Sequence, residues 1–414
     1  MLDILGGDIF RIEILFQSCS NLLYWVKIHM ANQIKINPVR SPHRRCDNRL
    51  QRFTSNGVKK GDIMDYLEKL KPEIDKIIEK YLPKKATKKW LDFAFGKAHY
   101  SFDLRAAQGA LAKPIWDFLN RGGKRWRPVL FLLVTEAIGG DIKKVKDFVV
   151  IPELAHEGSI ITDDLEDQSE TRRGKPCLHL IFGVDIATNA GNFLYFLPLL
   201  ALIKNRNKFK PEILVRAYEI YIQEMINLSL GQATDIYWHK GLAKEIDENQ
   251  YLQMCAFKTG CLSRMAAKLA VVLSEGSEDL AEKIGRVAEA VGIAFQIQDD
   301  ILNLTGEEFA KRKGGLGEDI TEGKRSLMVI HTLGKANKKD RKRLIEILNL
   351  HTKNQKIRNE AIGIIKKYGS VEYAKERAKN LIQKAWQDAG KLLPESLAKN
   401  RLNEFINYLI ERRI

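Results

Sequence analysis

Residues 161–176 read ITDDLEDQSETRRGKP, an acidic stretch followed at once by a basic one. On a helix, Asp163 and Asp167 are four residues apart and therefore lie on the same face. With Asp164 and Glu166 they place four carboxylates within five residues, whose repulsion calls for a nearby positive charge. Mg²⁺ is the natural candidate, because it combines one or two carboxylates with substrate phosphates. The alternative is a solvated acidic face, the commoner explanation of a single such cluster.

A second acidic cluster lies in the segment FQIQDDILN, residues 295–303. Asp299 and Asp300 end a predicted helix whose earlier positions, among them Ile284, Val287 and Val291, are apolar. A solvated face does not usually end such a helix, so the aspartate pair favours a functional site. Two acidic clusters facing each other across a helix bundle would hold several Mg²⁺ ions, and those ions would hold a diphosphate.

The pattern around these clusters is helical from residue 62 onward. Met64, Leu67, Leu70, Ile74 and Ile77 recur at three- and four-residue spacing, and a proline at position 83 ends the run. Similar stretches cover 103–120, 126–138, 143–166, 185–205, 211–237, 246–274, 278–304, 323–334, 340–349, 355–368, 371–390 and 394–412. Runs of period two are absent and nothing resembles a linker. The sequence predicts an all-α, single-domain helix bundle over residues 61–414.

Residues 1–60 differ from the rest of the chain. They hold ten Lys and Arg against four acids, which accounts for +6 of the net charge of +16, and show no sustained apolar period. Three interpretations compete: a targeting segment, a basic arm, or upstream sequence ahead of a later start at Met30 or Met64. Acids at positions 3, 8 and 13 argue against a mitochondrial presequence. We expect a poorly ordered basic extension or a start that is not native.

Composition narrows the functional classes. With 45% hydrophobic and 29% charged residues over 414 positions, the chain is globular, neither disordered nor collagen-like. The net charge of +16 favours anionic partners: nucleic acid, phospholipid or phosphorylated metabolites. Five cysteines without a CxxC pair indicate reduced thiols and a cytoplasmic protein. The apolar runs Ile14–Val26 and Phe193–Ile203 are too short to span a membrane, and the second fits a buried core helix.

Five motifs in a fixed order carry a resemblance to the trans-isoprenyl diphosphate synthases, or polyprenyl synthetases. They are GGKRWRP at 122–128, DDLED at 163–167 with RRGKP at 172–176, KTG at 258–260, FQIQDD at 295–300 and GEDITEGKRS at 317–326. The resemblance is close over residues 100–335. NFLYFLPL at 192–199, GQATDIYW at 231–238 and Asn303 look most like the geranylgeranyl diphosphate synthases. DDILN replaces the usual DDxxD there, so Asn303 is not expected to bind metal directly.

The resemblance implies an isoprenoid-synthase helix bundle around a central cavity, and a prenyltransferase activity. Such an enzyme ionises an allylic diphosphate (dimethylallyl, geranyl or farnesyl) with the help of Mg²⁺ and condenses it with isopentenyl diphosphate, here to geranylgeranyl diphosphate. The implied metal ligands are Asp163, Asp167 and Asp299, supported by Asp164 and Asp300. Three Mg²⁺ ions per site are expected, and Mn²⁺ is expected to substitute for them.

Further positions match the family residue by residue. Lys258, Lys324 and Arg172 match groups that grip the allylic diphosphate, Thr259 and Gln296 lie along the allylic chain, and Lys313 lies in a closing loop. Gln232 and Asp235 would support the metal ligands. The isopentenyl diphosphate site would be formed by Lys124, Arg127, His156 and Arg173. Other interpretations are a solvated helix start for Lys124 and Arg127 and a core histidine for His156.

Product length is expected to depend on the pocket below the diphosphate. Gly158 and Ser159 lie one helical turn before Asp163, and their small size predicts a product longer than fifteen carbons, with twenty preferred. The alternatives are a longer-chain polyprenyl diphosphate synthase and a non-catalytic regulatory subunit, although both aspartate motifs are intact. Nucleic-acid binding rests on charge alone and is not predicted. A homodimer or higher homo-oligomer is expected, with at most peripheral membrane contact.

Overall fold

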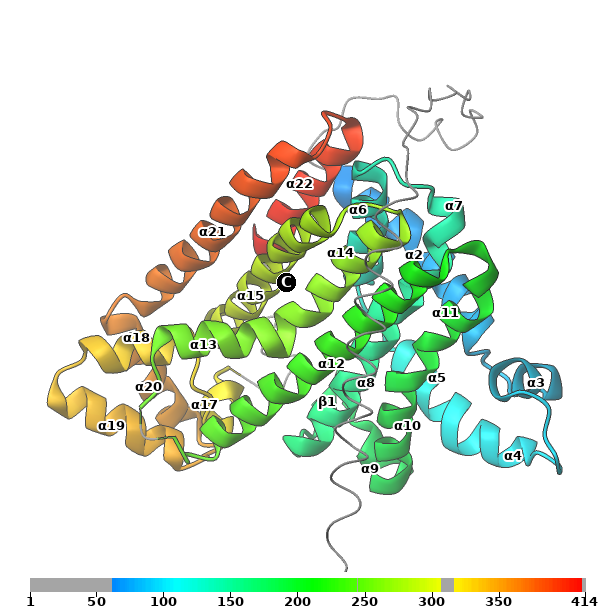
Figure 1. Ribbon diagram of the computed structural model, residues 1–414. Coiled ribbons are helices and arrows are strands. Elements are labelled where there is room, and N and C mark those ends of the chain that lie inside the picture. Colours follow the sequence, from blue (N-terminus) through cyan, green and yellow to red (C-terminus); the bar gives the residue numbers. More distant parts are fainter. Residues whose placement is uncertain (1–61, 244, 307–315, 412–414) are drawn as a thin grey trace, which may run out of the picture. The chain divides into compact units, whose positions relative to one another are not determined.

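The computed structural model describes residues 62–243, 245–306 and 316–411 (Figure 1). The predicted N-terminal extension, residues 1–60, and Lys313 lie outside the described residues. Almost all described secondary structure is helical, which confirms the predicted all-α class. The first half of the chain forms α2 (Asp62–Tyr81), α3 (Lys88–Phe95), α4 (Leu104–Ala107), η2 (Gln108–Ala112), α5 (Lys113–Leu119), α6 (Trp126–Ala137), α7 (Ile142–Val145), η3 (Lys146–Val149), α8 (Val150–Glu166), α9 (Leu178–Phe182), α10 (Val184–Phe196), η4 (Leu197–Leu199), α11 (Leu200–Asn205) and η5 (Arg206–Lys208).

The second half continues the bundle. Its elements are α12 (Pro211–His239), α13 (Glu248–Cys255), η6 (Ala256–Gly260), α14 (Cys261–Leu273), α15 (Glu278–Thr305), α17 (Glu318–Glu322), α18 (Leu327–Lys335), α19 (Lys338–Asn349), α20 (Gln355–Lys367), α21 (Ser370–Ala389), η7 (Gly390–Leu392) and α22 (Leu397–Glu411). Helix α14 is buried on nearly every side and packs against α6, α8, α12 and α15. A helix that is apolar all round belongs in the core, and α14 forms the centre of this one.

Several short elements were not predicted, namely a β-hairpin and the helices α3, α9 and α17. The strands β1 (Thr171–Arg172) and β2 (Lys175–Pro176) form an antiparallel hairpin whose turn residues, Arg173 and Gly174, both have positive φ. Strands of two residues are too short to produce a period of two, which is why the pattern missed them. The five-residue helix α17 was missed for the same reason, because one turn contains no repeat of apolar positions.

Three helices approach one another closely next to the second acidic cluster. A Cβ atom at Gly231 of α12 would lie 2.3 Å from the backbone nitrogen of Lys258, and one at Gly292 of α15 would lie 2.6 Å from Cα of Gly260. Glycine is therefore required where α12 and α15 meet η6. The segment η6 is a π-helix between α13 and α14, a distortion found frequently at functional sites. The close approach carries Lys258 and Thr259 to the interior of the bundle.

One helical stretch, Val184–Lys208, is long and apolar enough by composition to cross a membrane, which the sequence analysis had not anticipated. It joins α10, η4, α11 and η5, and half of its apolar window is buried within the protein. Helix α10 packs along α8, the helix of the first acidic cluster. This packing agrees with the prediction of a core helix, and core helices meet the same criterion of length and composition.

Candidate active site

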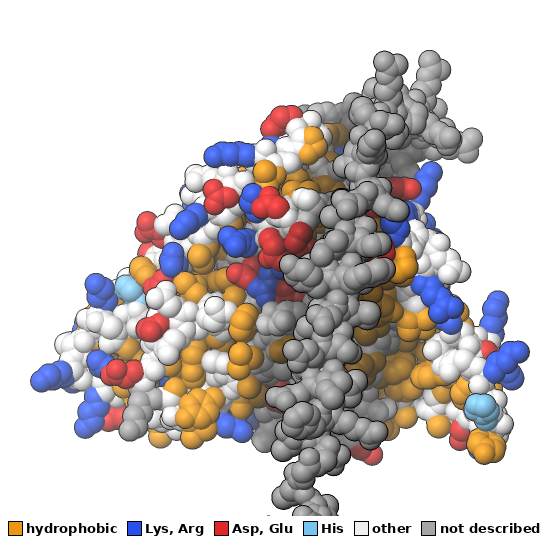
Figure 2. Space-filling view, viewed as in Figure 1, with side chains coloured by type: hydrophobic (Ala, Val, Ile, Leu, Met, Phe, Trp, Pro, Cys, Tyr) orange, Lys and Arg blue, Asp and Glu red, His pale blue; other side chains and the backbone are white. Residues whose placement is uncertain are grey.

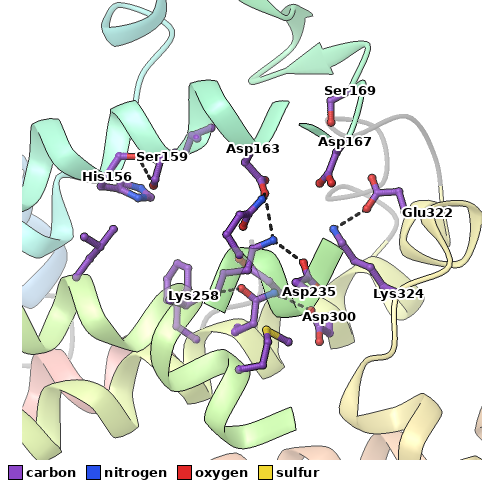
Figure 3. Close-up of a pocket in the computed structure, with 18 of the residues that line it drawn as sticks. His156, Ser159, Asp163, Asp167, Ser169, Asp235, Lys258, Asp300, Glu322 and Lys324 are labelled. Carbon is purple, nitrogen blue, oxygen red and sulfur yellow. Dashed lines mark hydrogen bonds and ion pairs between the residues drawn. The ribbon is translucent and has the colours of Figure 1, made fainter. Parts of the chain in front are cut away.

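A cavity of about 420 Å³ lies between α8, α12, α15, η6 and the α17 segment (Figure 3). The structure brings together in its wall most of the residues singled out by the sequence: Lys124, Arg127, His156, Ser159, Asp163, Asp167, Arg172, Arg173, Gln232, Asp235, Lys258, Thr259, Gln296, Asp299, Asp300 and Lys324. The two acidic clusters, 136 residues apart from Asp163 to Asp299, thus meet at one cavity. Helix α8 supplies the first and the end of α15 supplies the second.

Asp163 is the centre of a charged network. Its Oδ1 accepts hydrogen bonds from Nζ of Lys258 at 3.1 Å and from Nε2 of Gln232 at 2.9 Å (Figure 3). Lys258 also donates to Oδ2 of Asp235 at 2.5 Å. Burial opposes the ionisation of Asp163, but Lys258 and Lys324 outweigh burial and hold its pKa well below the usual range. Asp163 is therefore a permanent carboxylate at neutral pH.

The pKa values of Asp167 and Asp300 are raised, in contrast to that of Asp163. Burial, together with the charge of Asp163, raises the pKa of Asp167 to about 7. Burial and the charge of Asp319 raise the pKa of Asp300 to about 7. Both carboxyl groups therefore lie where the surrounding side chains supply too little positive charge to ionise them fully. A bound cation would supply that charge.

The second aspartate of the first motif has a different position. Asp164 is buried, does not line the cavity, and accepts a hydrogen bond from Nε of Arg172 at 2.7 Å. Arg172 lies on β1 and also approaches Asp163, at 3.8 Å. Asp164 thus aims Arg172 at the cavity, so that the hairpin following the acidic motif contributes a cation to it.

A chain of hydrogen bonds holds the side chains around Asp300 of the second acidic cluster. The hydroxyl of Thr259 donates to Oε1 of Gln296 at 2.9 Å, and Nε2 of Gln296 donates to Oδ1 of Asp300 at 2.8 Å. The hydroxyl of Tyr251 donates to the other oxygen of Asp300 at 2.9 Å. Each side chain is thereby held in one orientation. Tyr251, on α13, was not singled out by the sequence analysis, because a lone tyrosine in an amphipathic helix carries no motif.

Asn303 explains the departure from the usual DDxxD pattern. Its side chain is buried, and its Oδ1 accepts a hydrogen bond from the backbone nitrogen of Asp319 at 3.2 Å, while its carbonyl oxygen accepts one from Gly317 at 2.9 Å. It therefore anchors the start of α17. That helix precedes Lys324, whose Nζ lies 2.5 Å from Glu322 and 3.5 Å from Asp319. The structure gives Asn303 a supporting position, in line with the expectation that it does not bind metal.

Several other side chains that line the cavity are basic. Burial lowers the pKa of Arg127 to about 10, which still leaves the guanidinium charged at neutral pH. Burial, and then Arg127, hold the pKa of His156 well below its usual value, so its imidazole is neutral. His156 lines the cavity instead of being enclosed by the core, and Lys124 and Arg173 lie in the same wall.

Ser159 faces the cavity, whereas Gly158 faces the neighbouring helix α10. Ser159 lines the cavity, and its hydroxyl donates to the carbonyl of His156 at 2.7 Å. Gly158 faces α10 instead, where an added Cβ would lie 2.9 Å from the carbonyl oxygen of Gly191 and from Cβ of Leu194. A larger residue at 158 would therefore push α8 from α10, and only position 159 is placed to shorten the cavity directly.

Comparison with known proteins agrees with this geometry. The family model of polyprenyl synthetases matches residues 108–365. The chain belongs to the polyprenyl synthetase family. It is 34% identical to the short chain isoprenyl diphosphate synthase of Methanothermobacter thermautotrophicus over 71% of this chain and 88% of that protein. It is 32% identical to a geranylgeranyl pyrophosphate synthase of Dictyostelium discoideum over 70% of this chain and 90% of that protein.

A solved structure supports the same assignment. The geranylgeranyl pyrophosphate synthetase of Pyrococcus horikoshii superposes with a TM-score of 0.73 and 31% identity, covering 86% of this chain and 100% of that one. The predicted family, the isoprenoid-synthase helix bundle and the assignment as a trans-prenyltransferase are thus confirmed. One structural neighbour, the geranylgeranyl pyrophosphate synthase of Corynebacterium glutamicum, was solved in complex with isoprenyl diphosphate and magnesium.

The carboxylates of this polyprenyl synthetase fit such a metal ion. Among the described residues, no three His, Cys, Asp or Glu side chains are grouped closely enough to hold a metal on their own. Mg²⁺ commonly uses one or two carboxylates and completes its shell with waters and substrate phosphates. Asp167 and Asp300, which burial keeps from full ionisation, and the hard oxygen donors of both clusters suit that type of site.

Proposed function

We propose that this polyprenyl synthetase condenses isopentenyl diphosphate with an allylic diphosphate to give geranylgeranyl diphosphate. The observation that carries the proposal is that aspartates of both motifs and the basic side chains Lys124, Arg127 and Arg173 line one and the same cavity. Two anionic substrates need two sets of positive charge, here metal ions held by the aspartates and the basic side chains, in one space where their hydrocarbon parts can meet. The similarity to geranylgeranyl pyrophosphate synthases from two organisms supports the product.

The proposed roles follow from position. Asp163, Asp167 and Asp299 would hold divalent metal, which when bound acts as a Lewis acid toward the leaving diphosphate. We propose that three Mg²⁺ ions bind in each active site and that Mn²⁺ can replace them. Lys258, Lys324 and Arg172 add fixed positive charge around the same diphosphate. Thr259 and Gln296 present oxygen dipoles to the allylic carbon as positive charge develops there.

The second diphosphate is held by the basic side chains of the cavity. Arg127 and Arg173 supply guanidinium donors, and the neutral His156 supplies a ring N–H without adding charge. Attack of the isopentenyl double bond on the allylic carbon forms the new carbon–carbon bond, and loss of a proton completes the condensation. The hydrogen bonds that hold Thr259 and Gln296 in place reduce the reorganisation needed when the cation forms.

One incubation tests the function. The full-length protein is mixed with Mg²⁺, isopentenyl diphosphate and each allylic primer in turn, and the products are sized by chromatography. Geranylgeranyl diphosphate from farnesyl diphosphate supports the proposal. Products longer than twenty carbons would favour the long-chain alternative, and no condensation with any primer would favour a regulatory subunit.

The synthase domain boundary at residue 61 and the cytoplasmic location stay predictions. The buried free thiols of Cys177, Cys255 and Cys261 agree with a cytoplasmic location.

Replacing Ser159 by Phe is expected to shorten the product to fifteen carbons or fewer. The side chain lines the cavity one turn below Asp163, so a phenyl ring would fill the space needed by the last isoprene unit. The products of S159F and wild type are compared by chromatography. Ser159→Ala serves as the control, because it removes the hydroxyl without adding volume. A twenty-carbon product from S159F would contradict this pocket argument.

A homodimer is proposed from an apolar stripe on α12. Five side chains at spacings of seven, four, four and seven residues are each more than half exposed, at 52–58%: Val215, Ile222, Ile226, Leu230 and Tyr237. Figure 2 shows hydrophobic side chains at several places on the face of the molecule in this view. A helix that presents a continuous apolar stripe to water favours association with a second copy.

Ile226→Glu is expected to convert the dimer to a monomer. A carboxylate in the middle of the stripe would be buried unpaired in the dimer, at a cost of several kcal/mol. Light scattering after size exclusion should give the wild type twice the 47.3 kDa of one chain and I226E a single chain. Leu350→Glu is the control, since Leu350 is equally exposed but lies beyond the end of α19. A monomeric wild type would contradict the dimer.

A further inference from the structure

A buried carboxylate contacts one of the basic side chains that line the cavity. Glu157 follows His156 on α8, is fully buried, and does not itself line the cavity. Its Oε1 accepts hydrogen bonds from Nη1 of Arg125 at 2.9 Å and from Nη2 of Arg173 at 3.1 Å. The proposed reaction uses neither Glu157 nor Arg125. The contact joins a cavity residue to an ion network in the core.

Arg173 depends on that contact for its conformation. It has a φ of +54° at the first turn position of the β1–β2 hairpin, a left-handed conformation that a long side chain rarely adopts. Its guanidinium donates to the carbonyl of Gly122 at 2.7 Å as well as to Glu157, and lies 4.9 Å above the ring of Phe118. The strained turn is held by these contacts, since strands of two residues contribute little.

Glu157 is also held by Arg125, which donates to the same oxygen, Oε1, as Arg173 does. Arg125 is buried, also has a positive φ of 49°, and donates to Glu153 at 2.8 Å and to Asp75 of α2 at 3.0 Å. A guanidinium held by two further carboxylates cannot follow a moving partner. Glu157 therefore presents its carboxylate to Arg173 in one orientation.

We propose that Glu157 is a positioning residue that fixes Arg173 in the wall of the cavity for the diphosphate of isopentenyl diphosphate. The inference rests on the proposed function, which assigns Arg173 to that substrate. Glu157 also offsets the repulsion among three arginines, Arg125, Arg127 and Arg173, while no substrate is bound. Without the carboxylate, the hairpin and its guanidinium leave the cavity wall, and the diphosphate must order them when it binds.

Glu157→Gln is the direct test, because it keeps the shape and removes the charge. We expect the KM for isopentenyl diphosphate to rise about tenfold and the KM for farnesyl diphosphate to stay unchanged. Calorimetric titration with isopentenyl diphosphate in the absence of metal should show the same loss of affinity. Glu224→Gln is the matched control: Glu224 is a buried carboxylate that accepts from Nε of Arg264 at 2.6 Å, away from the hairpin.

A double-mutant cycle separates positioning from general stability. In the Arg173→Ala background, E157Q should raise the KM for isopentenyl diphosphate no further. If E157Q does not fold, Glu157→Asp retains the charge at a shorter reach and should give a smaller rise with the same selectivity. The inference is overturned if E157Q leaves that KM unchanged, raises both KM values equally, or keeps its full effect without Arg173. Absence of any condensation by the wild type would instead refute the proposed function.

Discussion

Asp163→Asn is expected to lower kcat for prenyl transfer at least about a thousandfold. Asn has the shape of Asp, and its carbonyl oxygen would still accept from Lys258 and Gln232, which lie 3.1 and 2.9 Å from Oδ1. The variant therefore loses charge while keeping the packing of α8. Ionisation of an allylic diphosphate separates charge, and the carboxylate that would help to hold the neutralising cation is the group removed.

The measurement is steady-state turnover with farnesyl and isopentenyl diphosphates at saturating Mg²⁺. D163N should unfold cooperatively at a somewhat lower temperature than the wild type, because Lys258 loses one of its two counter-charges, and a D163N protein that is folded at the assay temperature separates lost chemistry from lost folding. Asp279→Asn is the control, because Asp279 lies exposed in the first turn of α15, where it pairs with Lys283. Turnover of D163N within tenfold of the wild type would remove Asp163 from the metal site.

Gly231→Ala is expected to destabilise the fold by about 1–3 kcal/mol and to reduce turnover about a hundredfold. The new methyl carbon would lie 2.3 Å from the backbone nitrogen of Lys258 and 2.6 Å from the carbonyl carbon of Phe257. Backbone atoms of η6 cannot rotate away as a side chain does, so α12 and η6 must separate. Lys258 and Gln232, which both contact Asp163, would then move from the carboxylate.

Chemical denaturation and turnover, measured on the same preparation, test this expectation. Gly363→Ala is the matched control, since an added Cβ there meets nothing within 4 Å and the exposed position in α20 should gain helix propensity. G363A should be as stable as the wild type or slightly more stable. A G231A protein with unchanged stability and turnover would show that the close approach of α12 and η6 is not needed.

Much of the fold followed from apolar spacing. The prediction of a first helix from residue 62 that ends before the proline at 83 matches α2, Asp62–Tyr81, and the long predicted stretches match α12 and α15 closely. Spacing succeeds for such helices because one face must be buried over several turns. It failed for the β1–β2 hairpin and for the short helices α3, α9 and α17, which contain too few turns for a clear apolar repeat.

The candidate site divides in the same way. The motifs predicted which residue types gather, and the cavity contains nearly all of them, with Lys313 outside the described residues. Glu157 and Tyr251 carried no motif, because a single buried acid or tyrosine looks like any other helical residue. Gly158 matched a chain-length position, yet it faces α10. The direction of a side chain depends on the rotation of its helix against its neighbours.

From the sequence alone, the order of the charged motifs carried the resemblance that gave the family and the reaction class, and the spacing of apolar residues determined the helical architecture. Only the tertiary structure decided that Asp164 orients Arg172 through a hydrogen bond, that Asn303 anchors the start of α17, and that Glu157 holds Arg173 of the hairpin. These pairings join elements that are distant in sequence or too short to show a pattern. Their partners are chosen by packing and by the need of every buried charge for a counter-charge.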